Sequence, residues 1–188
     1  MYVQKEFEGE RIKLVSMIPN HALMVFNALH DHSPSNLSFF KTPVNRQRED
    51  EWIENMASSN QDLVFLIFLK DENRIIGTIG LHEYDRANNN ARLGLFIFKE
   101  ADRKQGFGTE SLKLLLDFAF NEFGLHKVYA RILANSDHTS ALTRFYVNIG
   151  FVFEGEMWEE YLLGGEYYDM ASFSILKKKW EAIKKSKS

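Results

Sequence analysis

The chain has 188 residues, of which 45% are hydrophobic and 26% charged, a composition typical of one globular domain with a substantial core. The net charge of -3 argues against general binding to nucleic acids, which normally requires a basic surface. The absence of cysteine excludes disulfides, thiolate metal ligands and a cysteine nucleophile, and it is compatible with a reducing compartment.

The distribution of apolar residues along the sequence does not indicate a membrane protein. Residues 1–10 are charged and lack the apolar core of a signal peptide. The longest apolar run, Val64 to Leu69, is far too short to span a bilayer. We therefore expect a soluble, cytoplasmic protein with no membrane partner.

The first third of the chain predicts a strand followed by two helices. Glu10–Ser16 alternates between apolar and polar residues as a strand does, and residues 19–29 and 48–56 have helical spacing. Between the helices, His30-Asp31-His32 invites interpretation as a metal site. No further cluster of ligands stands out, so we interpret the segment as a polar loop and expect no metal.

The middle of the chain predicts three strands in succession. They are Val64–Lys70, Arg74–Glu83 and Ala91–Phe98, and polar turns join them. Consecutive strands with short connections favour an antiparallel meander.

A long amphipathic helix follows the third strand. Its apolar residues recur at helical spacing, and Gly124 stands where a C-terminal cap belongs. The apolar face consists of Leu112, Leu115, Leu116, Ala119, Phe120 and Phe123.

The turn between this strand and this helix contains Gly106 and Gly108, preceded by Arg103 and Lys104. Unpaired N–H groups of a first helical turn, the positive end of the helix dipole and residues without Cβ together favour an anion such as pyrophosphate. Gly-x-Gly alone is weak evidence, since most such turns only connect elements. No Gly-Lys-Ser/Thr follows, and the third glycine of a dinucleotide fingerprint is missing, so ATP and NAD are poor candidates.

The last third predicts a strand, a helix and a hairpin. Lys127–Ala134 alternates as a strand, Ser140 to about Ile149 forms a helix, and Phe151–Tyr161 pairs with Glu166–Leu176. The lysine-rich tail from Lys177 is most simply a solvated helix or a frayed end. The whole pattern is mixed α/β around one sheet, in a single domain over residues 1–188 with its core at about 10–180.

The arrangement Arg-x-x-Gly-x-Gly at Arg103, Gly106 and Gly108 resembles the acetyl-CoA signature of the GNAT superfamily of N-acetyltransferases. The resemblance extends from about Arg11 to Trp180 and is strongest to the ribosomal-protein-alanine and spermidine acetyltransferase branches. It implies a GNAT fold, with one largely antiparallel central sheet flanked by helices. The two central strands would splay apart to admit the pantetheine arm of CoA.

The resemblance implies an enzyme that transfers an acetyl group from acetyl-CoA to a primary amine by direct attack in a ternary complex. A protein N-terminal α-amine is the first candidate acceptor, and a polyamine (spermidine or spermine) or another small amine is the alternative. A CoA-binding sensor without turnover is the alternative of another class. The resemblance leaves a homodimer open and implies no metal.

The residues that the resemblance assigns to CoA lie mainly around the glycine turn. They are Phe96, Ile97 and Phe98 through backbone groups, and Arg103, Lys104, Gln105, Gly106, Phe107, Gly108, Thr109, Asn135 and Tyr146. The spacing after Asn135 is one or two residues longer than the family pattern, so either Asn135 or a serine supplies that contact. Ser140 is such a serine, although a helix N-cap is its plainer role.

Two residues are candidates for the proton transfers. Tyr146 matches the tyrosine that family members direct at the CoA sulfur, in the spacing Tyr-x-x-x-Gly-Phe, and would protonate the leaving thiolate; its plain alternative is a buried core tyrosine. The usual glutamate position holds Arg92, which would repel a polycation if it lined the site. Glu83 can act as the base directly or through water, with a solvated surface position as the plain alternative.

Overall fold

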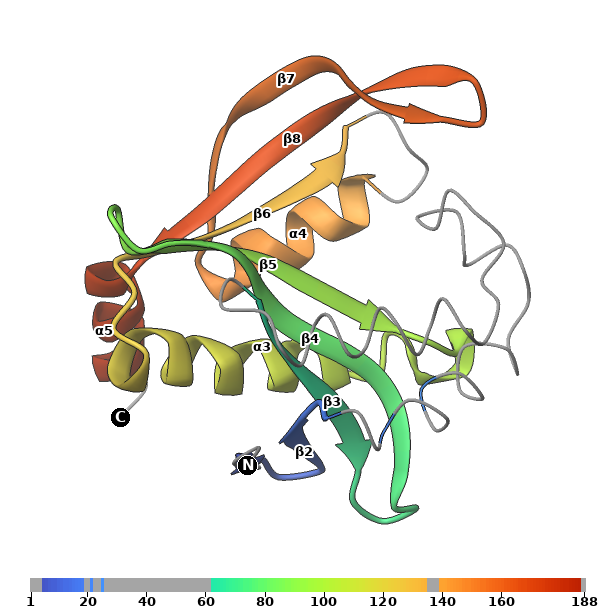
Figure 1. Ribbon diagram of the computed structural model, residues 1–188, viewed down its shortest axis with the longest axis vertical. Helices are drawn as coiled ribbons and strands as arrows, with labels where there is room; N and C mark the ends of the chain where they lie inside the picture. The colour runs from blue at the N-terminus through green and yellow to red at the C-terminus, as the bar shows by residue number, and fades with distance from the viewer. Residues whose placement is uncertain (1–4, 19–20, 22–24, 26–61, 135–138, 187–188) are drawn as a thin grey trace. The chain divides into compact units, whose positions relative to one another are not determined.

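The computed structural model describes residues 5–18, 21, 25, 62–134 and 139–186 (Figure 1). The strands are β1 (Glu6–Glu8), β2 (Ile12–Ser16), β3 (Leu63–Leu69), β4 (Arg74–Asp85), β5 (Asn90–Ile97), β6 (Lys127–Leu133), β7 (Val152–Leu163) and β8 (Glu166–Leu176). The helices are α3 (Phe107–Asp117), α4 (Thr139–Ile149) and α5 (Lys177–Lys185). The strands form one open sheet of 8 strands, in the order β1-β2-β3-β4-β5-β6-β8-β7.

The predicted fold class is confirmed: a single sheet flanked by helices, with strands close to the predicted bounds. The short strand β1 was not predicted, because three residues are too few to show an alternating pattern. The predicted helices at 19–29 and 48–56 and the segment His30–His32 lie outside the described residues, apart from His21 and Val25. No helix among the described residues is long and apolar enough to cross a membrane.

The chain divides into two compact units, and each is discontinuous in sequence. The first comprises Met1–His82 and Gly94–Leu115, and the second comprises Glu83–Leu93 and Leu116–Ser188. The single domain over residues 1–188 stays a prediction.

The first unit is organised around β2 and β3. Antiparallel pairing places Ile12 opposite Leu69 and Val15 opposite Leu66, so the apolar residues of the two strands pack together. A core cluster of Met17, Val25, Leu66, Ile75 and Phe98 forms beside them. This core supports the end of β5, from which the chain enters the glycine turn.

The second unit is built on β6, which pairs antiparallel with β8 along its whole length, from Lys127↔Leu176 to Leu133↔Met170. Its parallel pairing with β5 covers only Asn90–Arg92. The helix α4 contacts β6 and β7. Phe120 and Phe173, at 0% and 1% exposure, are the largest completely buried side chains of this unit.

The helix α3 continues into a π-helical turn at Phe118–Glu122, in which the N–H of Phe123 donates to the carbonyl of Phe118 at 2.9 Å. Gly124 then adopts a φ of +83°, a conformation that residues with a Cβ rarely take. The predicted C-terminal cap is therefore confirmed, and the N–H of Leu125 closes it on the carbonyl of Ala119.

The C-terminal tail is more ordered than the lysine-rich sequence suggests. The helix α5 contacts β8 and buries Trp180, which is 4% exposed. The indole Nε1 of Trp180 donates to Asp117 Oδ1 at 2.9 Å, and the Nζ of Lys184 lies 2.6 Å from the same oxygen. Trp180 thus anchors the helix, so the tail is not merely a solvated or frayed end.

This anchor predicts a large contribution of Trp180 to stability. Replacing Trp180 by alanine removes a buried indole and leaves a cavity, and we expect the free energy of unfolding to fall by about 3 kcal/mol in urea titrations. Lys184→Ala is the matched control, because it removes only an exposed ion pair worth less than about 1 kcal/mol. Equal losses for the two variants would contradict the anchoring role of the indole.

Candidate functional site

The glycine turn lies in the first unit, between the end of β5 and the start of α3. Gly106 has a φ of +87° and Lys104 a φ of +59°, so the chain reverses through two left-handed residues before the helix begins at Phe107. Lys104, Gln105 and Gly106 are exposed, whereas Phe107, Gly108 and Thr109 are half-buried. The turn therefore presents its backbone to solvent at the N-terminus of a helix, which is where anions bind.

The predicted cation Arg103 does not extend into solvent. Its Nε and Nη2 donate to the carbonyl of Ile97 at 3.1 and 3.0 Å, and Nη2 also lies 3.3 Å from the carbonyl of Phe98. The N–H of Phe98 is already bound to the carbonyl of Ile76 at 2.9 Å. Arg103 thus ties the turn to the last residues of β5.

The same strand end passes close to β4. A Cβ on Gly77 would lie 2.2 Å from the carbonyl oxygen of Phe96, so only glycine fits there. The predicted pairing of Phe96, Ile97 and Phe98 with the pantetheine arm must use backbone groups other than those already bound, and it stays a prediction.

An ion pair between half-buried Arg74 and buried Asp102 fixes the segment just before the turn. Arg74 Nη1 and Nη2 donate to the two carboxylate oxygens of Asp102, each at 2.7 Å, and Asp102 is only 6% exposed. This bidentate bond to Asp102, together with a single bond from Arg74 Nε to Glu72, raises the pKa of the Arg74 guanidinium. Asp102 belongs to the short 3-10 turn Glu100–Asp102, so the pair sets the path by which the chain reaches Arg103.

Asp102→Ala is expected to lower the free energy of unfolding by about 2 kcal/mol, because it removes the charged hydrogen bonds of Arg74 to its main partner while the half-buried Arg74 keeps Glu72. Thermal or urea unfolding measures the loss. Glu72→Gln is the control, since it removes only the more exposed partner of Arg74 and should cost less than about 1 kcal/mol. A loss no larger than that of the control would exclude Asp102 as the fixed point of this segment.

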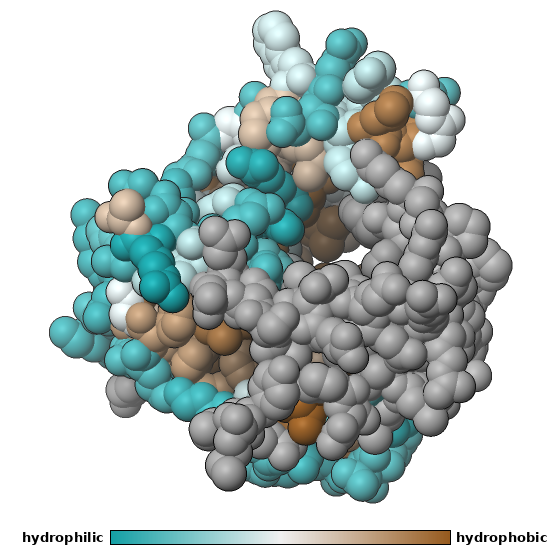
Figure 2. All heavy atoms as spheres, viewed as in Figure 1, coloured by the Kyte–Doolittle hydropathy of each residue, from teal (hydrophilic) through white to brown (hydrophobic). Residues whose placement is uncertain are grey.

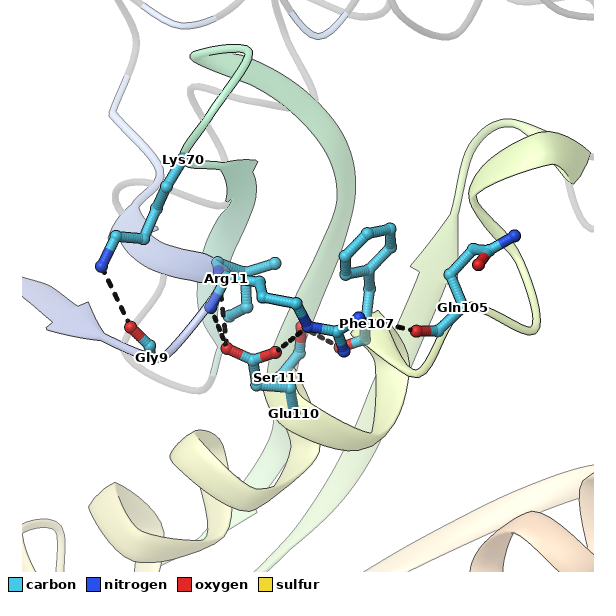
Figure 3. Close-up of polar contacts among 8 residues, drawn as sticks. Gly9, Arg11, Lys70, Gln105, Phe107, Glu110 and Ser111 are labelled. Carbon is cyan, nitrogen blue, oxygen red and sulfur yellow. Dashed lines mark hydrogen bonds and ion pairs between the residues drawn. The ribbon is translucent and has the colours of Figure 1, made fainter.

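Sequence reasoning missed Arg11, which reaches the turn from residues before β2 (Figure 3). Its Nη1 donates to the carbonyl of Gln105 at 3.0 Å, and its Cζ lies 4.7 Å from the centre of the Phe107 ring. Its Nε binds Glu110 Oε2 at 3.2 Å. No sequence signal near Arg11 indicates these contacts, since Arg11 and Glu110 are 99 positions apart.

In the second unit, Glu83 is the centre of a polar cluster. Its Oε1 accepts from Arg92 Nε at 2.8 Å, and its Oε2 accepts from the Tyr129 hydroxyl at 3.0 Å. Burial acts to raise the pKa of Glu83, but the bonds from Arg92 and Tyr129 and the nearby charges of Arg92 and Arg131 outweigh it, so the pKa is lowered. Glu83 also has a φ of +54°, which is uncommon for a residue with a Cβ.

Tyr146 lies on α4 and is buried, with 7% of its surface exposed. Its ring stacks on Phe173 with centroids 5.9 Å apart and touches Phe145 and Phe151. Burial raises the pKa of Tyr146 to about 12. Among the residues that the structure describes, none hydrogen-bonds to its hydroxyl, an unusual state for a buried polar group.

The remaining predicted contacts are Asn135 and Ser140. Asn135 lies outside the described residues. Ser140 is the second residue of α4 and is exposed, so the prediction that it caps the helix is wrong. Thr139, at the first position of α4, donates from Oγ1 to the carbonyl of Leu133 at 2.8 Å.

His82 and Asp62 form another pair of titratable side chains, which lies in the first unit. His82 Nδ1 is 2.9 Å from Asp62 Oδ1, and Gly94 leaves room for the imidazole, since a Cβ there would be 2.7 Å from His82 Nε2. Among the described residues, no group of three or more His, Cys, Asp or Glu side chains is arranged to hold a metal ion.

Comparison with known proteins identifies the class of protein that this fold represents. The profile of the acetyltransferase (GNAT) domain matches residues 11–152. The chain therefore belongs to the GNAT family, and it is an N-acetyltransferase.

Among curated relatives, YokL of Bacillus subtilis (strain 168), a prophage-derived N-acetyltransferase, is 26% identical over 92% of this chain and 94% of its own length. YdaF of the same organism, named as a ribosomal N-acetyltransferase, is 28% identical over 71% of this chain and 69% of its own. A solved spermidine N-acetyltransferase from Vibrio cholerae, in complex with CoA and spermine, superposes with a TM-score of 0.78. That alignment covers 91% of this chain and 98% of the other at 21% identity, so the two proteins share a fold.

Proposed function

We propose that this N-acetyltransferase takes its acetyl group from acetyl-CoA and binds the CoA diphosphate at residues 103–109. The observation that carries the proposal is the exposed Gly106, with a φ of +87°, immediately before the first turn of α3. Such a turn offers backbone N–H groups and the positive end of a helix dipole to a phosphate, without a Cβ in the way. The CoA bound in the solved protein of the same fold supports the use of acetyl-CoA.

We assign Tyr146 to the leaving thiolate. When the amine attacks the carbonyl carbon, the carbon–sulfur bond breaks and negative charge develops on sulfur. A tyrosine whose pKa is about 12 keeps its proton at neutral pH and can donate a hydrogen bond to that sulfur. Complete transfer to a thiolate, whose thiol ionises near ~8.5, is unfavourable for such a weak acid, so we propose that Tyr146 acts mainly by hydrogen bonding.

Tyr146→Phe is expected to lower kcat about 100-fold and to change the KM for acetyl-CoA by less than about twofold, because phenylalanine keeps the ring contacts with Phe173. Steady-state assays of thiol release measure both constants. Tyr168→Phe is the matched control: its hydroxyl binds the exposed Glu166, and its loss should leave both constants unchanged. A large rise in KM with unchanged kcat would assign Tyr146 to binding and refute this role.

We propose Glu83 as the carboxylate on the path of the amine proton. Because its pKa is lowered, Glu83 is ionised at neutral pH and is a weak base. A weak base suits an acceptor that is already partly neutral. A peptide α-amine, with a pKa near ~7.7, meets that condition, whereas a polyamine or lysine amine near ~10.4 does not.

This match supports a protein N-terminal α-amine as the acceptor. Arg92 gives less support to that choice than the sequence suggests, since Glu83 offsets its charge at 2.8 Å. Polyamines are the second candidate, because the β7–β8 hairpin between Val152 and Leu176 contains six acidic residues and no lysine or arginine. Figure 2 shows hydrophilic and hydrophobic side chains mixed on this hairpin, at the top of the view.

A panel of acceptors separates these possibilities. Thiol release from acetyl-CoA would be measured with peptides bearing free α-amines, with spermidine and spermine, and with aminosugars. We expect the greatest kcat/KM for a peptide, and a loss of activity when its α-amine is blocked. A preference for spermidine would replace the first acceptor by the second, and tight CoA binding without turnover for any amine would favour a sensor.

A further inference from the structure

The guanidinium of Arg11 contacts three successive residues of the glycine turn, although Arg11 is more than 90 positions before them in the sequence. It donates to the carbonyl of Gln105, lies over the Phe107 ring, and sits 3.1 Å from the position that a Cβ of Gly106 would take. Figure 3 shows the side chain extending along the start of α3 to reach the turn. A larger residue at position 106 would displace this side chain by a few tenths of an ångström and would be strained at a φ of +87°.

The bond to Gln105 fixes the orientation of a peptide plane. In a trans peptide the carbonyl of one residue and the N–H of the next point in opposite directions. Holding the Gln105 carbonyl on Arg11 therefore directs the Gly106 N–H away from Arg11. Without this donor, a turn with a glycine at φ +87° has little to prevent that peptide from rotating.

The next two peptides are fixed in the same manner by α3 itself. The Gly106 carbonyl accepts from the N–H of Glu110 at 3.0 Å, and the Phe107 carbonyl accepts from Ser111 Oγ at 2.8 Å. The N–H groups of Phe107 and Gly108 consequently point out of the start of the helix. The helix alone orients the N–H groups from Phe107 onward. By holding the Gln105 carbonyl, Arg11 orients one more N–H group, that of Gly106, in the same way.

Glu110 in turn fixes Arg11. Its Oε1 accepts from the backbone N–H of Arg11 at 2.8 Å and of Ile12 at 3.2 Å, and its Oε2 binds the Arg11 side chain. A Cβ on Gly9 would lie 2.5 Å from Glu110 Oε1, so glycine lets the chain close against this carboxylate. Because Glu110 offsets the Arg11 charge, orientation of the turn matters more here than attraction.

We propose that Arg11 is a positioning residue for the donor substrate, which aims the Gly106 N–H at the CoA diphosphate. This inference rests on the proposed function, since it assumes that the turn binds CoA. It adds a residue whose role the turn sequence alone does not show. The alternative is that Arg11 only ties the start of β2 to α3. In that case, loss of the side chain would affect acyl donors with and without a diphosphate equally.

The test compares two acyl donors in Arg11→Gln. Loss of a charged hydrogen bond should raise the KM for acetyl-CoA about tenfold while kcat stays within about twofold. Acetylpantetheine, which lacks the diphosphate, should react at the wild-type kcat/KM. Equal losses with both donors, or no change with acetyl-CoA, would overturn the proposal.

Lys70→Gln is the matched control, because Lys70 binds Glu8 at 2.9 Å and the Gly9 carbonyl at 3.1 Å without contacting the turn. It removes the same charge from the same corner and should leave the KM unchanged. Arg11→Lys, which can keep one donor to Gln105, should restore part of the affinity and carries the comparison if Arg11→Gln fails to fold. If the wild-type protein takes up no CoA in calorimetry, the proposed function fails; if it does and the variants match it, only this inference fails.

Discussion

The geometry of the glycine turn depends on how the carbonyl groups at the start of α3 are bound. A helix leaves its first N–H groups without internal partners, so these become binding groups only if the peptides that carry them are held still. The carbonyls of Gln105, Gly106 and Phe107 each have a partner within the first unit. The N–H groups on the opposite sides of these peptides are the ones that a diphosphate can use.

Around this turn, charged side chains act mostly as structural ties. Arg103 binds the carbonyls at the end of β5, and Arg74 binds the buried Asp102. Of the cations next to the glycines, Lys104 is exposed. Arg103, which the motif would direct at phosphate, thus holds backbone in place instead, and this reduces the conformational freedom that a ligand would otherwise have to remove.

Local patterns predicted the elements well, and long-range partners not at all. The periodicity from Leu112 to Phe123 and the position of Gly124 fixed α3 and its end, because both signals lie within a few residues. The pairing of Arg11 with Glu110 and of Tyr129 with Glu83 depends on which distant elements become neighbours, which periodicity does not encode. Trp180 was overlooked for a different reason: lysines dominate the composition of the tail, and they hid the helical spacing of Trp180 and Ile183.

The anchoring of α5 has a consequence for synthesis of the chain on the ribosome. Residues of the first unit end at Leu115, so all of it has been translated well before the chain is complete. The second unit needs Trp180, which is 63 positions after Asp117 in the chain, to form its bond with Asp117. Domains fold from the N-terminus as they emerge, so nascent chains would form the glycine turn while the half carrying Tyr146 still awaited its final helix.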